Sequence, residues 1–179
     1  MTSKAITSPS ASIATANNVL LIVDAESLLP RYPHPSLEPK KPTVIEDDFI
    51  FAISGTTTTQ NAKSDSVITL TANNRKVFHL RGRTVSLLAE HSVVFHNMTV
   101  SDDGVLSPPK LVVHSDQTVP APDPANPTQP GSHKAGDHYW ECSQLTMGVA
   151  TCELSFMLIN QRCEAMGYFS WKTEVTLSA

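Results

Sequence analysis

The stretch Ser66-Val-Ile-Thr-Leu-Thr-Ala72 decides the fold class, because its side chains alternate in character at every step. In an extended strand, the odd-numbered side chains from Val67 to Thr71 face one way, and the even-numbered ones from Ile68 to Ala72 face the other. A helix would place apolar residues three or four positions apart instead. The stretch therefore predicts a β-strand with two distinct faces.

Segments of the same kind recur along the chain and define the expected architecture. The first of these segments, residues 18–24, is a continuous apolar run, which is typical of a strand buried on both faces. Helical signals are limited to a turn at 24–29, with Asp24 as the N-cap, and a turn at 87–90. We therefore expect an all-β protein, an antiparallel two-sheet β-sandwich of the jelly-roll or Greek-key kind with at most one or two short helical turns. The other expected strands are 18–24, 49–54, 76–81, 92–100, 111–114, 139–144, 151–159 and 168–177.

Thirteen prolines against seven glycines set the boundaries between these strands. Five prolines fall in residues 30–42 and seven in residues 108–130. Since proline cannot donate to a sheet ladder, both clusters predict ordered loops or extended connections, and we expect the second to be the more mobile. Residues 1–16 are expected to be a disordered tail, and residues 17–179 a single β-sandwich domain.

The composition excludes several classes of protein. Hydrophobic residues make up 40% of the chain, which argues against disorder, and the net charge of −4 argues against nucleic acid as a partner. The longest apolar run, residues 19–23, is too short to span a membrane, and no signal peptide is recognisable. Three cysteines without a CxxC pair fit a reducing compartment, so a cytoplasmic location is expected.

No motif for catalysis or for a cofactor stands out. GxSxG, P-loop and GxGxxG patterns are absent from the sequence, so we expect a protein that is not an enzyme and that needs no cofactor. His79, His91 and His96 lie on neighbouring expected strands, but their spacing does not begin a metal site, and their role stays open. We therefore expect no metal.

Four residues are the candidate surface for a ligand or for assembly. Asp24 and Glu26 directly follow a buried strand, where carboxylates belong either to a helix cap or to a site. Tyr168 and Trp171 lie in the aromatic segment at 166–171, where aromatic residues fall on both faces of a strand. Such a strand either packs inside a monomeric sandwich or is covered on its outer face by a partner subunit.

Two long segments, one near each end of the chain, resemble segments of a known family. The opening, Asn18-Val-Leu-Leu-Ile-Val-Asp-Ala-Glu-Ser-Leu-Leu29 with the following Tyr32-Pro-His-Pro-Ser36 and Pro39-Lys-Lys-Pro-Thr43, is similar to the first strand and loop of the bacterial PixA/AidA inclusion-body protein family. The closing Gly167-Tyr-Phe-Ser-Trp-Lys-Thr-Glu-Val-Thr-Leu177 is similar to its aromatic last strand, and His91-Ser-Val-Val94 fits a central step. The resemblance covers about residues 17–178.

The resemblance implies a protein regulated by quorum sensing or growth phase, which in some members forms intracellular inclusions or is linked to virulence and host interaction. It brings no catalytic residues. The chain has only five methionines and so departs from the methionine-rich inclusion-forming member. We expect a self-associating homo-oligomer, a dimer or higher. The alternative is a lectin-like sandwich that binds a carbohydrate or another small ligand through loop residues, namely Asp24, Glu26, Asp102, Asp103, Asn160 and Gln161.

Overall fold

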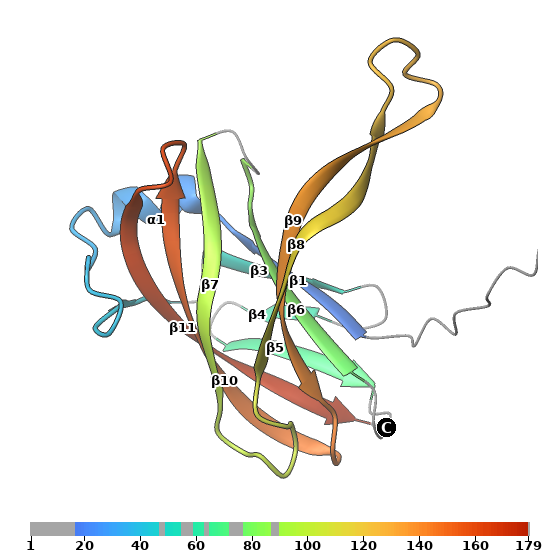
Figure 1. Ribbon diagram of the computed structural model, residues 1–179. Helices are drawn as coiled ribbons and strands as arrows, with labels where there is room; N and C mark the ends of the chain where they lie inside the picture. Colours follow the sequence, from blue (N-terminus) through green and yellow to red (C-terminus); the bar gives the residue numbers. More distant parts are fainter. Residues whose placement is uncertain are drawn as a thin grey trace, which may run out of the picture.

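Eleven strands and one short helix make up the part of the chain that the structure describes (Figure 1). This computed structural model describes residues 17–178 apart from 47–48, 55–58, 63–64, 72–76 and 87–89, so the expected tail at 1–16 and most of the second helical turn lie outside it. The elements are β1 (Asn17–Val23), α1 (Ala25–Arg31), β2 (Thr43–Val44), β3 (Ile50–Ser54), β4 (Thr59–Ala62), β5 (Asp65–Thr71), β6 (Val77–Thr84), β7 (His91–Val100), β8 (Lys110–Pro122), β9 (Pro130–Ser143), β10 (Gly148–Asn160) and β11 (Ala165–Ser178).

The strands form two sheets packed face to face, which confirms the expected β-sandwich. Sheet A has the order β3-β1-β6-β9-β8, and sheet B has the order β4-β5-β11-β10-β7, with β2 also paired to β11. The expectation of purely antiparallel sheets is wrong, because β1 runs parallel to β6, and β11 runs parallel to both β5 and β2. Parallel neighbours need a long connection, and the chain between β1 and β6 makes several other strands before it returns to the sheet.

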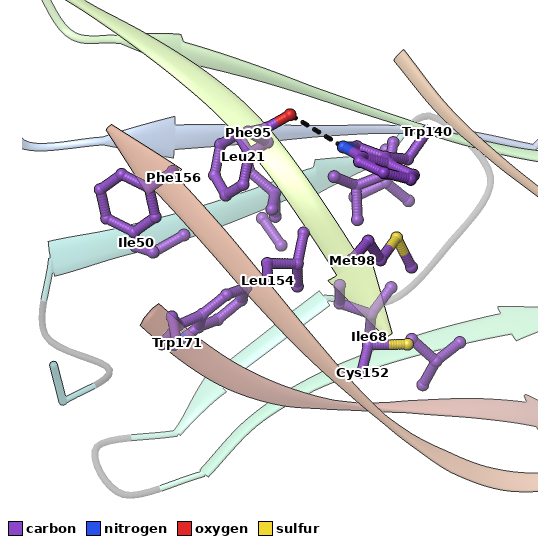
Figure 2. Close-up of a cluster of buried hydrophobic side chains, with 14 of the residues drawn as sticks. Leu21, Ile50, Ile68, Phe95, Met98, Trp140, Cys152, Leu154, Phe156 and Trp171 are labelled. Atoms are coloured by element: carbon purple, nitrogen blue, oxygen red, sulfur yellow. Dashed lines mark hydrogen bonds between the residues drawn. The ribbon is translucent and has the colours of Figure 1, made fainter. Parts of the chain in front are cut away.

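The core lies between the sheets (Figure 2) and includes three neighbouring phenylalanine rings, those of Phe95, Phe156 and Phe169. The ring centroids of Phe95 and Phe156 are 5.1 Å apart, and those of Phe156 and Phe169 are 5.4 Å apart. The indole Nε1 of Trp140 in sheet A donates a hydrogen bond to the carbonyl oxygen of Phe95 in sheet B at 2.9 Å. This buried bond ties the sheets together where β9 faces β7.

β1 is buried on one face only, which corrects the expectation of a strand buried on both. Val19, Leu21 and Val23 are almost completely buried against sheet B, whereas Leu20 and Ile22 on the other face are partly exposed. A continuous apolar run does not distinguish a strand covered on both sides from one whose outer face carries apolar residues. The outer face of sheet A is thus more apolar than alternation alone would indicate.

The first proline cluster is an ordered connection, as expected. Asp24 caps α1 by accepting a hydrogen bond from the Ser27 backbone N–H at 3.0 Å, which confirms the expected N-cap. Beyond the helix, the Ser36 carbonyl oxygen accepts a bond from the Tyr168 N–H at 2.8 Å, and Pro35 packs directly on Gly167. The connection therefore covers the first half of β11.

Apart from the strand expected at 111–114, which is present, the expectation of a connecting loop at 108–130 is wrong, because most of this segment is strand. β8 runs from Lys110 to Pro122 and pairs with β9 up to the pair Pro122 and Pro130, which leaves only residues 123–129 as a turn. The outer half of the β8–β9 pair, residues 115–136, extends away from the sandwich as a twisted arm (Figure 1). None of its side chains is buried.

The register explains how the arm accommodates its prolines. Pro122 and Pro130 lie opposite each other, and because neither has an N–H, their pair is one of the non-hydrogen-bonded pairs of an antiparallel ladder. Pro120 lies two residues from Pro122 without a shift in register, so its nitrogen also points away from the partner strand. Proline is tolerated on such outer edges, where the ladder needs no donor.

Candidate functional site

Asp24 and Glu26, two of the residues singled out from the sequence, lie at the start of α1. The Asp24 carboxylate is occupied by its bond to Ser27, and Glu26 is exposed in the first helical turn, where a negative charge favours the helix. Both therefore have a structural role in the helix.

Tyr168 and Trp171 lie on opposite faces of β11. Trp171 is 1% exposed and packs in the core, so its indole is not on a surface (Figure 2). The Tyr168 ring lies on the outer face of sheet B, half-buried, with its centroid 5.6 Å from that of His96. The chain's own connection at Pro35 and Ser36 lies against this part of β11, so the four candidate residues do not form one surface.

The loop residues proposed for a lectin-like site do not form one group, because Asp102 and Asp103 follow the end of the β7–β10 pair opposite to Asn160 and Gln161. Asp102 accepts the Gly104 N–H within a turn at 2.8 Å, and Asn160 organises the β10–β11 turn by accepting the N–H groups of Arg162 and Glu164. Asn160 and Gln161 line an open, shallow hollow with Glu90, His91 and Arg162. Among the described residues, no three His, Cys, Asp or Glu side chains are placed to hold a metal ion.

A different group of polar side chains does converge, on the outer face of sheet A. On β6 the residues with outward side chains alternate with buried ones, and residues in register on β9 and β8 face the same way. We call this group the Tyr139 cluster. It consists of His79, Arg81 and Arg83 of β6, Asp137, Tyr139 and Glu141 of β9, and His114 of β8.

Asp137 anchors the cluster at the base of the arm. Its two carboxylate oxygens accept one hydrogen bond each, from Arg81 Nε at 3.1 Å and from Arg83 Nη2 at 3.1 Å. Burial opposes ionisation of this carboxyl, but the hydrogen bonds and positive charges of the two arginines outweigh it and lower the Asp137 pKa below its usual value. The backbone ladder between β6 and β9 ends at Leu80 and Trp140, so these ion pairs continue the contact where the ladder stops.

Tyr139 lies at the centre, with charged and aromatic groups around its ring. The Arg81 guanidinium carbon is 4.3 Å from the ring centroid, a cation–π contact, and Arg81 also donates to Asn18 on β1 at 3.0 Å. The His79 ring centroid is 4.4 Å away, and His79 Nε2 lies 3.2 Å from a Glu141 oxygen. On the other side His114 Nε2 lies 3.5 Å from the Tyr139 hydroxyl.

Next to the cluster, the same face of sheet A carries exposed apolar side chains. Phe51 and Ile53 on the edge strand β3 are 41% and 52% exposed, and they lie opposite Ile22 and Leu20 on β1. We call these four residues the apolar strip. In register, Leu20 and Ile22 are the neighbours of Arg81 and Arg83, so the strip and the cluster form one continuous outer face.

Sequence reasoning missed the cluster, although part of its signal was present. His79, Arg81 and Arg83 alternate within or next to an expected strand, which places them on one face. Their partner Asp137 lies outside every expected strand, and no local pattern states that β9 pairs with β6. The position of Asp137 beside two arginines is a product of the topology.

The fold and these surfaces define a two-sheet β-sandwich with mixed sheets and a projecting two-stranded arm. In the described part of the chain, no helix has the length and apolar character needed to cross a membrane. The chain has three free cysteines, of which two are buried. Burial raises the pKa of Cys142 and of Cys152 to about 12, and Cys163 lies exposed in a turn.

Comparison with known proteins identifies the family. A family model named PixA and described as inclusion body protein matches residues 15–177, so the chain belongs to the PixA inclusion body protein family. The crystal structure of an inclusion body protein of this family from Burkholderia cenocepacia is similar, with a TM-score of 0.76 and 18% sequence identity over 91% of this chain and 95% of that chain. No match was found among curated proteins. The family resemblance seen in the sequence is confirmed.

Proposed function

We propose that the protein is a non-enzymatic, self-associating protein of the inclusion-body type, cytoplasmic and produced under quorum-sensing or growth-phase control. Family membership supports this role. The observation that carries the self-association is the apolar strip, because exposed Phe51 and Ile53 lie together on a flat sheet face and beside charged residues. Interfaces between copies combine such apolar and aromatic residues with arginine.

The low content of charged residues also favours association. Only 17% of the residues are charged, which weakens the repulsion that keeps copies apart. The two edge strands of sheet A, β3 and β8, differ in their proline and charged residues. β3 carries no proline and no charged residue, whereas β8 carries Lys110 and Asp116 and, in the arm, Pro120 and Pro122. We therefore assign the contact between copies to the β3 side of sheet A.

The free, buried state of two thiols supports a cytoplasmic location and a lack of enzymatic activity. Cys142 and Cys152 are free and buried in strands, where their raised pKa keeps them protonated and unreactive. In the described part of the chain, no cysteine or histidine is paired in the manner of an activated nucleophile. The proposal includes a link to virulence and host interaction, and only family membership supports this part.

Sedimentation velocity at increasing protein concentration tests the self-association. We expect the wild-type protein to sediment as a dimer or larger species, and Ile53→Lys to shift the distribution toward the monomer, because it places a charge in the apolar strip. Met147→Lys is the matched control, since Met147 is 64% exposed in the turn before β10, away from the strip. A strict monomer for the wild type at high concentration would refute the proposal.

Binding of a carbohydrate or another small ligand is a second candidate function. The loop residues first considered for such binding do not form one site, because Asp102 and Asp103 lie at the opposite end of the β7–β10 pair from Asn160 and Gln161. The Tyr139 cluster favours it instead, since it brings donors, acceptors and an aromatic ring together on one solvent-facing sheet. The two functions are compatible and have independent readouts.

A further inference from the structure

The Tyr139 cluster combines two properties of a binding site, fixed geometry and access from solvent. Each charged side chain is held by at least one neighbour across a strand boundary, and yet the side chains keep between 15% and 38% of their surface exposed. A ligand would therefore meet groups that are already oriented, and binding would cost little further ordering of side chains.

Stability alone explains only part of this arrangement. The pairing of Asp137 with Arg81 and Arg83 holds the base of the arm, where the β6–β9 ladder ends. His79, Glu141 and His114 are not needed for that clamp. Partly exposed ion pairs of this kind contribute little to stability, because ordering long side chains offsets their attraction.

The unused hydrogen-bonding capacity of the cluster indicates the kind of ligand. Within the described part of the chain, one Glu141 oxygen, Arg81 Nη2 and Arg83 Nε have no hydrogen-bond partner, and the Tyr139 hydroxyl has only the long contact to His114. Carboxylate oxygens accept and guanidinium nitrogens donate, so acceptors and donors lie side by side. This combination suits hydroxyl groups, which do both.

The charge balance narrows the ligand class further. Two arginines face two carboxylates, Asp137 and Glu141, so these four side chains have no net charge, and Lys110, the register partner of Glu141 on β8, adds one positive charge at the border of the cluster. A phosphate or another strong anion would have to displace Asp137 from the arginines that hold it. A neutral ligand with several adjacent hydroxyls can bind without breaking these pairs.

We propose that the Tyr139 cluster is a binding site for a neutral carbohydrate. Vicinal hydroxyls of one sugar unit donate to the Glu141 carboxylate and accept from the guanidinium groups of Arg81 and Arg83, with Tyr139 beside the sugar. The arm begins next to Asp137 and borders this site. It would contact further units of a longer glycan. The proposal rests on the second candidate function and does not require self-association.

Saturation-transfer NMR tests the site with a set of methyl glycosides of D-galactose, D-mannose, L-fucose and N-acetyl-D-glucosamine, and with N-acetylneuraminic acid as the acidic probe. We expect transfer to at least one neutral glycoside. Glu141→Gln should weaken its binding by about tenfold or more, because a hydrogen bond to a charged acceptor becomes one to a neutral acceptor. Tyr139→Phe is a second variant that retains the ring and removes the hydroxyl, and it should also weaken binding.

The matched control is Glu153→Gln, which removes a charge from a glutamate paired with Lys172 at 3.6 Å on the outer face of sheet B. It should bind sugar like the wild type. Equal weakening by Glu153→Gln, binding of the acidic probe alone, or no transfer to any neutral glycoside would each overturn the proposal. Repeating the titration with Ile53→Lys separates sugar binding from assembly, and urea midpoints verify that each variant is folded.

Discussion

Gly82 on β6 offers a sharp test of the packing between the sheets, because its hydrogen atoms face the Phe95 ring. A Cβ at position 82 would lie much closer to the Phe95 ring carbons than the roughly 3.5 Å of an ordinary carbon contact. The ring cannot swing into solvent, since Phe95 is 2% exposed and packs against Phe156. Gly82→Ala should therefore overpack the core.

The magnitude follows from two opposing effects. Overpacking a core costs about 1–3 kcal/mol, whereas replacing glycine by alanine restricts the unfolded chain and stabilises by about 0.4–1 kcal/mol. We expect Gly82→Ala to lower the free energy of unfolding by about 1–2 kcal/mol. For a domain of this size, that corresponds to a decrease in Tm of roughly 3–6 °C.

Gly136→Ala is the matched control, because it makes the same chemical change on a strand of the same sheet. There the nearest atom to a new Cβ is the His114 carbonyl oxygen at 3.5 Å, an ordinary contact. This variant should be unchanged or more stable by up to about 1 kcal/mol. Urea unfolding followed by tryptophan fluorescence measures both. If Gly82→Ala is as stable as the wild type, the Phe95 ring does not fill the space above Gly82.

Two further predictions concern ionisation and thiol reactivity. The Asp137 pKa is lowered in the folded protein, so its ionisation stabilises the fold above its unfolded-state pKa of about 3.9, and this contribution is lost as the pH falls through the lower folded-state value. Asp137→Asn should therefore reduce stability at neutral pH and flatten the loss of stability between about pH 5 and pH 2, as measured by urea midpoints; identical pH profiles would contradict it. At pH 8, Ellman's reagent should modify only Cys163 in the folded protein, since Cys142 and Cys152 are buried with a pKa raised to about 12. Cys163→Ser should abolish that reaction, and rapid modification of a second thiol would contradict the buried placement.

The sequence predicted where the strands of this fold lie better than it predicted which strands pair with each other. Alternation at residues 66–72 and the aromatic segment at 166–171 correspond to β5 and β11, because side-chain period depends on local geometry. The parallel pairing of β1 with β6 depends on residues far apart in the chain, which no local pattern encodes. The helix cap at Asp24 is local and was predicted correctly.

Proline caused the largest error, for a physical reason. A missing N–H excludes proline from the inside of a ladder, but it costs nothing where the nitrogen faces outward. The backbone nitrogens of Pro120, Pro122 and Pro130 all point outward in this way, so a segment that resembles a loop forms half of a long hairpin. Which way a nitrogen points depends on register, and register became known only from the paired strands.

The same three prolines limit how copies of this chain can be stored together. Strands that zip along their edges build fibres of continuous backbone hydrogen bonds, which dissolve poorly. An arm without donors at these edge positions resists growing in this way along the β8–β9 edge, whereas the β3 edge has no proline to protect it. Packing through side chains on the sheet face, by contrast, responds to dilution, salt and pH. We therefore expect a deposit held together only through the apolar strip to return to folded, soluble molecules when it is diluted.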